Sequence, residues 1–208
     1  TSGGTISSNG GSTVTVSGIV WSTTSTPTIA LSTKTTNGAA TGTYTSSITG
    51  LAPATLYYVR AYATNSIGTA YGPQNNFTTL AIAPTISATA TVISITGTTA
   101  TSGGTITVDG GATVTSRGVV WGTTTGSSTF SATSGTGTGT YPSNLSGLSI
   151  ATTYFVRAFA TNSAGTAYGP EVQFATPNTA TVASTITSTI TSSTAILGGV
   201  LSSTGGAT

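Results

Sequence analysis

Side chains able to perform acid–base, nucleophilic or metal chemistry are almost absent from this chain. Its 208 residues include no His, Cys or Met, and the only carboxylates are Asp109 and Glu171. General acid–base catalysis needs titratable groups held close together, nucleophilic catalysis needs a base beside its nucleophile, and metal sites need several ligands. Asp109 precedes two glycines, as in a tight turn, and its counterpart in the repeat described below is Asn9. We therefore predict no enzyme activity, no metal site and no cofactor.

The cations are equally few and are scattered along the chain. Lys34, Arg60, Arg117 and Arg157 give a formal net charge of +2, and charged residues make up 3% of the composition. Nucleic-acid binding needs clustered Lys and Arg that displace counterions, so we predict that the chain does not bind nucleic acid. No apolar run approaches the length of about 18 residues that a membrane-spanning helix requires, so we expect no such segment.

One arrangement of side chains could support binding. An arginine lies between two aromatic residues at two-residue spacing, which places all three on one face of a strand. The motif occurs twice, at Tyr58, Arg60 and Tyr62 and at Phe155, Arg157 and Phe159. Two interpretations remain open. The three side chains form either a self-contained ladder that covers the sheet, or an exposed stripe that packs on another subunit or on a glycan ring.

The opposite face of the same strands is predicted to be core. It begins with Tyr57 in one copy and Tyr154 in the other, followed by Val and two Ala at alternate positions. Small alanines leave room for a large side chain from a neighbouring strand or from the opposing sheet. We expect Trp21 and Trp121 to fill that room as core residues and not to act as ligand platforms.

These elements belong to a repeat of domain length. Tyr57 to Asn65 and Gly68 to Pro73 recur as Tyr154 to Asn162 and Gly165 to Pro170, a shift of roughly 97 to 100 residues. The repeat predicts three segments. Residues 1–80 form a repeat that lacks its first strand, residues 85–177 form a complete repeat, and residues 181–208 form the opening strands of a third.

Short strands separated by turn residues predict an all-β fold. Aliphatic and aromatic residues alternate with hydroxyl residues, and turn signals recur about every 8 to 12 residues, as in tandem antiparallel β-sandwiches. In the complete repeat we expect residues 85–94 and 98–108 to be strands, and Arg117 to Trp121 to be a short central strand. Residues 122–139 differ in length between the copies, and we expect a loop there.

The segment from Leu51 to Ala63 resembles a fibronectin type III domain, an immunoglobulin-like fold. That family places a leucine, a proline and a threonine before a corner tyrosine, and the matching residues here are Leu51, Pro53, Thr55 and Tyr57. The resemblance implies that the hydroxyls of Tyr57 and Tyr154 bond to backbone near the turn and lock this corner. The second copy departs from the pattern, because Ile150 stands at the place of the proline.

The whole chain resembles the tandem fibronectin-like repeats of cell-surface and secreted proteins of Bacteroidota. The resemblance is carried by Gly18 to Thr23, Tyr58 to Asn65 and Gly68 to Gly72, and by their counterparts in the second copy. It implies an extracellular location and a role in cell adhesion or as a structural protein. The absence of Cys, Met and His is consistent with an exposed extracellular material, because such a chain resists oxidation and does not titrate near neutral pH.

The chain begins and ends within repeats, and two interpretations follow. The simpler one is a window taken from a longer array. In the other, the strands after residue 181 complete the open first repeat of another copy by strand addition.

From the sequence we expect a structural or adhesive segment of an extracellular bacterial surface protein, serving as a stalk, an adhesin shaft or a filament subunit. Low charge removes self-repulsion, so lateral or head-to-tail packing with other copies is expected, with surface glycans as further candidate partners. The alternative is a carbohydrate-binding or spacer module of a larger secreted enzyme.

Overall fold

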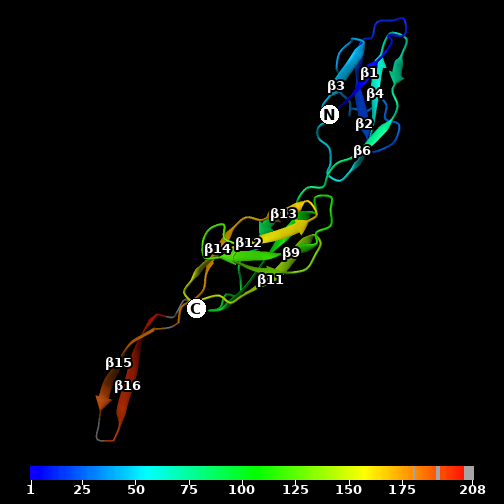
Figure 1. The fold of residues 1–208 in the computed structure, drawn as a ribbon. Coiled ribbons are helices and arrows are strands. Elements are labelled where there is room, and N and C mark those ends of the chain that lie inside the picture. Colours follow the sequence, from blue (N-terminus) through cyan, green and yellow to red (C-terminus); the bar gives the residue numbers. More distant parts are fainter. Residues whose placement is uncertain (180, 191–192, 204–208) are drawn as a thin grey trace. The chain divides into compact units, whose positions relative to one another are not determined.

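The computed structural model describes residues 1–179, 181–190 and 193–203, all of whose regular elements are β-strands. The chain divides into two compact units, Thr1–Ile82 (unit 1) and Ala83–Thr208 (unit 2). Figure 1 shows each unit with its strands labelled. All strand pairs are antiparallel, which confirms the predicted all-β class.

Unit 1 is a sandwich of a two-stranded and a four-stranded sheet. The smaller sheet pairs β1 with β3, and the larger has the order β2-β4-β5 with β6 also pairing with β4. The strands are β1 (Ser2–Ile6), β2 (Val16–Ser22), β3 (Gly42–Ser46), β4 (Leu56–Thr64), β5 (Thr69–Tyr71) and β6 (Asn75–Thr78).

Unit 2 contains the same sandwich with two additional strands. Three strands in the order β11-β8-β7 face five strands in the order β10-β9-β12-β13, with β14 also on β12. The strands are β7 (Thr85–Thr89), β8 (Thr99–Val108), β9 (Ser116–Gly122), β10 (Phe130–Thr133), β11 (Gly139–Ser146), β12 (Thr153–Asn162), β13 (Gly165–Tyr168) and β14 (Val172–Ala175). A separate hairpin follows, formed by β15 (Thr181–Ile190) and β16 (Ala195–Ser203).

The expectation of a loop over residues 122–139 is wrong in part. Phe130–Thr133 forms β10, which pairs with β9, and Phe130 lies opposite Trp121. The two rings stack with their centroids 5.9 Å apart. The strand was missed because it has only four residues between Gly- and Ser-rich stretches, and its pairing depends on a contact with a distant tryptophan.

The two-residue period of the central strand determines which side chains enter the core. Along β12, Tyr154, Val156, Ala158 and Ala160 are all buried, and Val156 lies opposite Trp121 on β9. Trp121 is 3% exposed within one apolar cluster, whereas its counterpart Trp21 is only half-buried. Unit 1 therefore has the smaller and more open core.

Truncation of the two tryptophans should destabilise the two units to different extents. Replacing Trp121 by Ala removes a fully packed side chain and should lower the free energy of unfolding of unit 2 by about 3–5 kcal/mol. Trp21→Ala should cost unit 1 clearly less, because that ring keeps part of its exposure in the folded state. Calorimetry of the full chain measures both transitions, and equal losses in the two variants would contradict this description of the cores.

Candidate interaction surfaces

The aromatic–arginine motif does not form an exposed stripe. Tyr62 is 4% exposed, and its hydroxyl donates a hydrogen bond of 2.7 Å to the Thr35 carbonyl. Tyr62 therefore does not lie on an open face, because the segment before β3 covers it. Tyr58, Phe155 and Phe159 are half-buried.

Two glycines allow a backbone carbonyl and a ring of the motif to lie close to the sheet. A Cβ built on Gly18 would stand 2.0 Å from the Thr35 carbonyl oxygen and 3.0 Å from Tyr62 Cε1. One on Gly118 would stand 1.9 Å from the Ala132 carbonyl oxygen and 2.9 Å from Phe159 Cε1. An aromatic ring over a cross-strand glycine covers backbone that would otherwise be open to water. This pairing was not expected from spacing, although both Gly and both rings recur in the repeat.

Each arginine of the motif stacks on a tyrosine from the neighbouring strand. The Arg60 guanidinium lies 4.4 Å from the centroid of the Tyr71 ring, and Arg157 lies 4.8 Å from that of Tyr168. Arg60 Nε also donates to the Gly72 carbonyl at 3.3 Å. These tyrosines were not predicted as site residues, but their recurrence in the Gly-Thr-Ala-Tyr-Gly-Pro segment was the available signal. The arrangement favours the self-contained ladder over a stripe open to a partner.

The second copy of this ladder also holds a loop. Arg157 Nη2 donates to the Gly126 carbonyl at 3.0 Å, and the Gly126 N–H donates to Glu171 Oε2 at 2.7 Å. Arg157 Nε is the one buried side-chain polar atom without a hydrogen-bond partner among the described residues. Tyr168 is 48% exposed, so one face of the Arg–Tyr stack is still open to solvent.

A tyrosine inside each sandwich joins the two sheets. Tyr141 on β11 is 3% exposed, and its hydroxyl lies 2.8 Å from the Gly118 carbonyl and 3.1 Å from the Phe159 carbonyl on the facing sheet. Tyr44 on β3 reaches the Gly18 and Tyr62 carbonyls at 2.6 and 3.3 Å. Burial raises the pKa of both phenols, and the nearby charge of Arg117 opposes the rise at Tyr141. Sequence reasoning treated these tyrosines only as repeat markers.

Arg117, the remaining arginine of the chain, also bonds within its own sandwich. Its guanidinium lies 4.8 Å from the Tyr141 ring, and Nη1 donates to the Thr138 carbonyl at 2.8 Å. Arg117 thereby holds the loop before β11 against the core tyrosine. Ser17 stands at the same place in unit 1 and donates to the Gly38 carbonyl at 3.0 Å.

The tyrosines at the strand corner accept hydrogen bonds from backbone. The Ala52 N–H donates to the Tyr57 hydroxyl at 3.0 Å, and the Ser149 N–H donates to the Tyr154 hydroxyl at 2.9 Å. Each ring stacks on a phenylalanine of a strand that pairs with its own, Phe77 on β6 and Phe174 on β14. The corner of each sandwich is thus fixed by one ring and one hydroxyl.

The two carboxylates support turns and loops. Asp109 Oδ1 accepts from the Gly111 N–H at 2.8 Å in the turn after β8, and Glu171 accepts from Gly126 as described above. Within the described residues no three His, Cys, Asp or Glu side chains come close enough together to hold a metal ion. The described part of the chain also contains no helix that is long and apolar enough to span a membrane.

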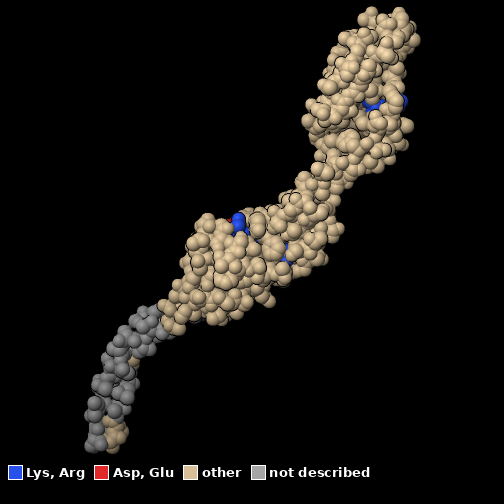
Figure 2. Space-filling model, in the orientation of Figure 1, with Lys and Arg blue, Asp and Glu red and all other residues tan. Residues whose placement is uncertain are grey.

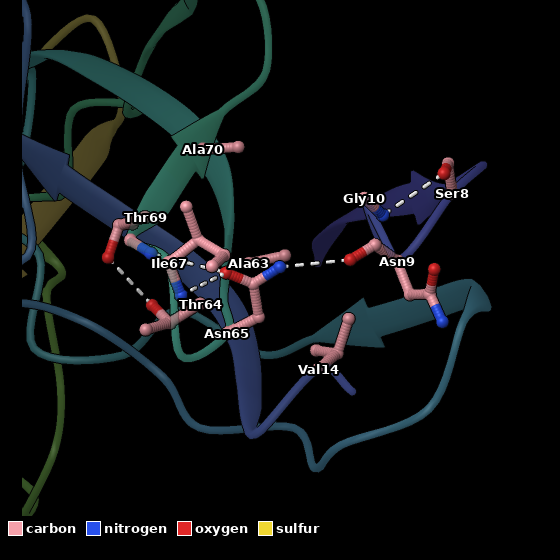
Figure 3. A pocket seen from close by; sticks show the side chains of 11 residues that line it. Ser8, Asn9, Gly10, Val14, Ala63, Thr64, Asn65, Ile67, Thr69 and Ala70 are labelled. Carbon is pink, nitrogen blue, oxygen red and sulfur yellow. Dashed lines mark hydrogen bonds between the residues drawn. The ribbon is translucent and has the colours of Figure 1, made fainter. Parts of the chain in front are cut away.

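A groove lies in unit 1 beside β1. It has two adjoining parts of about 360 and 260 Å³, which share Ser8, Ala63 and Ala70. Figure 3 shows the first part, with Val14, Ala63 and Ala70 among the labelled side chains and Asn65 bonded to the Asn9 carbonyl.

No protein-family model matches the chain, and no curated protein matches it. Among solved structures, a myokine structure matches at 21% identity and a TM-score of 0.36, over 45% of this chain and 100% of that one. The FN1–FN3 domains of chicken CNTN1 match at 16% identity and a TM-score of 0.35, over 77% of this chain and 56% of that one. A titin segment matches at 21% identity and a TM-score of 0.38, over 59% and 41%. The chain thus spans about half the length of the CNTN1 and titin structures.

Removal of the buried hydroxyl in unit 2 should destabilise that unit. Tyr141→Phe keeps the ring but leaves two carbonyls of the facing sheet without this donor, which should cost about 1–3 kcal/mol. The pH dependence should change as well. The folded pKa of Tyr141 lies above the ordinary value of 10.0, so the tyrosine stabilises fully below pH 10 and its contribution is lost as pH rises through the folded pKa. Denaturant unfolding at pH 8 and pH 11 should show a smaller fall for Tyr141→Phe than for the unchanged chain.

The Arg–Tyr stack should show a measurable coupling. A double-mutant cycle with Arg157→Ala and Tyr168→Leu should give a coupling energy of about 0.5–1 kcal/mol in unit 2. Arg60→Ala with Tyr168→Leu is the matched control, because these two residues belong to different units and should be additive. Additivity of Arg157→Ala and Tyr168→Leu would contradict the stack.

Proposed function

We propose that this chain is a structural repeat segment of an extracellular bacterial surface protein of the Bacteroidota type, which serves as a stalk, adhesin shaft or filament subunit. The observation that supports this proposal most is that the reactive and polar side chains are bonded within their own unit. In both units the hydroxyls of the cross-sheet and corner tyrosines, and the arginines that stack on tyrosine, contact the unit's own backbone and rings. Such side chains stabilise a scaffold and leave little for chemistry on a substrate.

The surface supports the same proposal. Figure 2 shows few charged side chains on the face drawn, and the chain as a whole has four cations and two carboxylates. A surface with so few charges changes little with mild pH or salt. A neutral surface also lets copies approach one another without long-range repulsion. Both properties suit a stalk or filament that stands outside the cell.

The short connection between the units adds a mechanical argument. Thr78 ends β6 and Thr85 begins β7, so few residues separate the last strand of one sandwich from the first strand of the next. A tether of about six residues restricts the distance between the sandwiches to about 20 Å when fully extended. A row of sandwiches joined by such short tethers covers a long distance with few linker residues, as a stalk requires.

Location and ligand preference together test this function. Antibodies against the chain should label intact cells that produce the full-length protein, and external protease should remove the label. On a glycan array the chain should show no saturable binding, because the Arg–Tyr ladders are used internally. Labelling only after cell lysis would contradict the stalk proposal. Saturable glycan binding that Arg157→Ala abolishes would contradict it in favour of a carbohydrate-binding module.

A further inference from the structure

Asparagine is followed by glycine at two places in the chain, Asn9-Gly10 and Asn37-Gly38. Asparagine is among the chemically labile residues of proteins. The main-chain nitrogen of a following glycine can attack its side-chain carbonyl carbon, because glycine has no side chain that blocks the approach. Both asparagines are exposed, so access to water does not distinguish them. Their hydrogen bonds differ, and this difference separates the two sites.

The Asn9 side chain is held by one hydrogen bond in a tight turn. Its Oδ1 accepts from the Gly11 N–H at 2.9 Å, and its Nδ2 has no hydrogen-bond partner among the described residues. The Gly10 N–H donates to the Ser8 hydroxyl at 3.1 Å and not to a neighbouring strand, as Figure 3 shows. The two nitrogens that take part in the reaction therefore both lie outside the ladder of the sheet.

The Asn37 side chain is held by three hydrogen bonds. Its Oδ1 accepts from the Thr35 hydroxyl at 2.9 Å and also from the Ser46 hydroxyl. Its Nδ2 donates to the Thr45 carbonyl at 2.7 Å. Rotation of this amide towards the nitrogen of Gly38 breaks these bonds, so the folded chain opposes the reaction at this site.

Unit 2 has the product of the reaction at the turn that corresponds to Asn9. Asp109 stands there, and its Oδ1 accepts from the Gly111 N–H at 2.8 Å, as Asn9 does from the glycine two residues on. The main-chain carbonyl of each accepts from the side-chain amide of an equivalent asparagine, at 2.9 Å from Asn65 in unit 1 and at 2.7 Å from Asn162 in unit 2. An aspartate at position 9 can thus keep the hydrogen bonds of this turn.

An aspartate is accommodated at position 9 but not at position 37. Asp109 is exposed although β7 pairs with β8 as far as the preceding residue, Val108, so the turn is open to water beside a complete sheet. At position 37 a carboxylate oxygen would replace the donor Nδ2 and would face the Thr45 carbonyl, where two acceptors would meet without a hydrogen.

We propose that Asn9 is a site of spontaneous deamidation, and that hydrogen bonds protect Asn37 from the same reaction. The Gly10 nitrogen loses its proton to hydroxide and forms a bond to the Asn9 side-chain carbonyl carbon. The bond from that carbon to Nδ2 breaks, ammonia leaves with a proton taken from water, and a succinimide ring remains. Water then opens the ring at either carbonyl and gives aspartate or isoaspartate.

The conversion changes a surface that has very few charges. The sequence has two carboxylates and a formal net charge of +2, so a further carboxylate removes one unit of that charge. Because the aspartate form keeps the bonds of the turn, the charge of unit 1 changes while its fold is retained. Copies of the chain that differ in age therefore differ in their mutual electrostatic repulsion.

Peptide mass mapping of the aged chain tests the proposal. Trypsin cleavage after Lys34 and Arg60 places Asn9 and Asn37 in different peptides, neither of which contains another asparagine or a glutamine. During incubation of the folded chain at mildly alkaline pH, the Asn9 peptide should change from amide to acid about tenfold faster, because one or two net hydrogen bonds protect Asn37. Equal rates in the folded chain, or no conversion at Asn9, would overturn the proposal.

The unfolded chain is the matched control for the protective role of the fold. In guanidinium chloride the two peptides should convert at similar rates, because each asparagine precedes a glycine and neither keeps its folded hydrogen bonds. If Asn37 were as slow in the unfolded chain as in the folded chain, its neighbours in sequence would explain the difference, and the protective role of the hydrogen bonds would be wrong.

Substitution by the product tests whether each site accepts it. Asn9→Asp should unfold at the same denaturant concentration as the unchanged chain, because the bonds to Gly11 and Asn65 are retained. Asn37→Asp should unfold unit 1 at a lower concentration, because the new carboxylate faces the Thr45 carbonyl. A fall in the unfolding midpoint of Asn9→Asp as large as that of Asn37→Asp would show that the turn does not accept the product, and would overturn this part of the proposal.

Discussion

The cohesion of each sandwich depends on one tyrosine that stands between the sheets. Tyr44 and Tyr141 place a ring in the core and a hydroxyl at carbonyls of the facing sheet. The chain has no Cys for a disulfide, and the described residues form no metal cluster, so packing and hydrogen bonds must hold the sheets together. A buried hydroxyl bonded to main chain satisfies groups that would otherwise be costly to bury.

Several small residues are consequences of this tyrosine. A Cβ on Gly104 would lie 2.5 Å from Ala158 Cβ and 3.0 Å from the Tyr141 hydroxyl, and Gly4 is similarly placed beside Ala61 and Tyr44. The glycine in β8 and the alanine in β12 thus allow the sheets to approach until the hydroxyl reaches its acceptors. A strand-interior glycine, which usually weakens a strand, is here the condition for a close approach of the backbone.

The repeat and its two-residue period predicted most of the fold but less of the candidate surface. The inward set from Tyr154 to Ala160 followed from alternation alone, because one side of each strand must face the core. Alternation could not show that the other side of β4 is also covered. Tyr62 is buried by a loop that is distant in sequence, and Arg60 meets Tyr71 only because β5 pairs in one particular register. Loop position and register arise from tertiary packing, which a single strand's pattern does not encode.

The two units show which contacts a sandwich of this type needs and which belong to the β7 strand alone. Both units have the cross-sheet tyrosine, the corner tyrosine and the Arg–Tyr stack, so none of these depends on the β7 strand. The half-buried apolar residues of unit 1, among them Ile6, Tyr44 and Ala61, are different, because their counterparts in unit 2 are buried. An apolar surface beside an unpaired strand edge is unfavourable in water and is a template for another strand. In unit 2 the strand β7 covers the corresponding residues, so burial at this edge is a separate requirement from the contacts that join the two sheets.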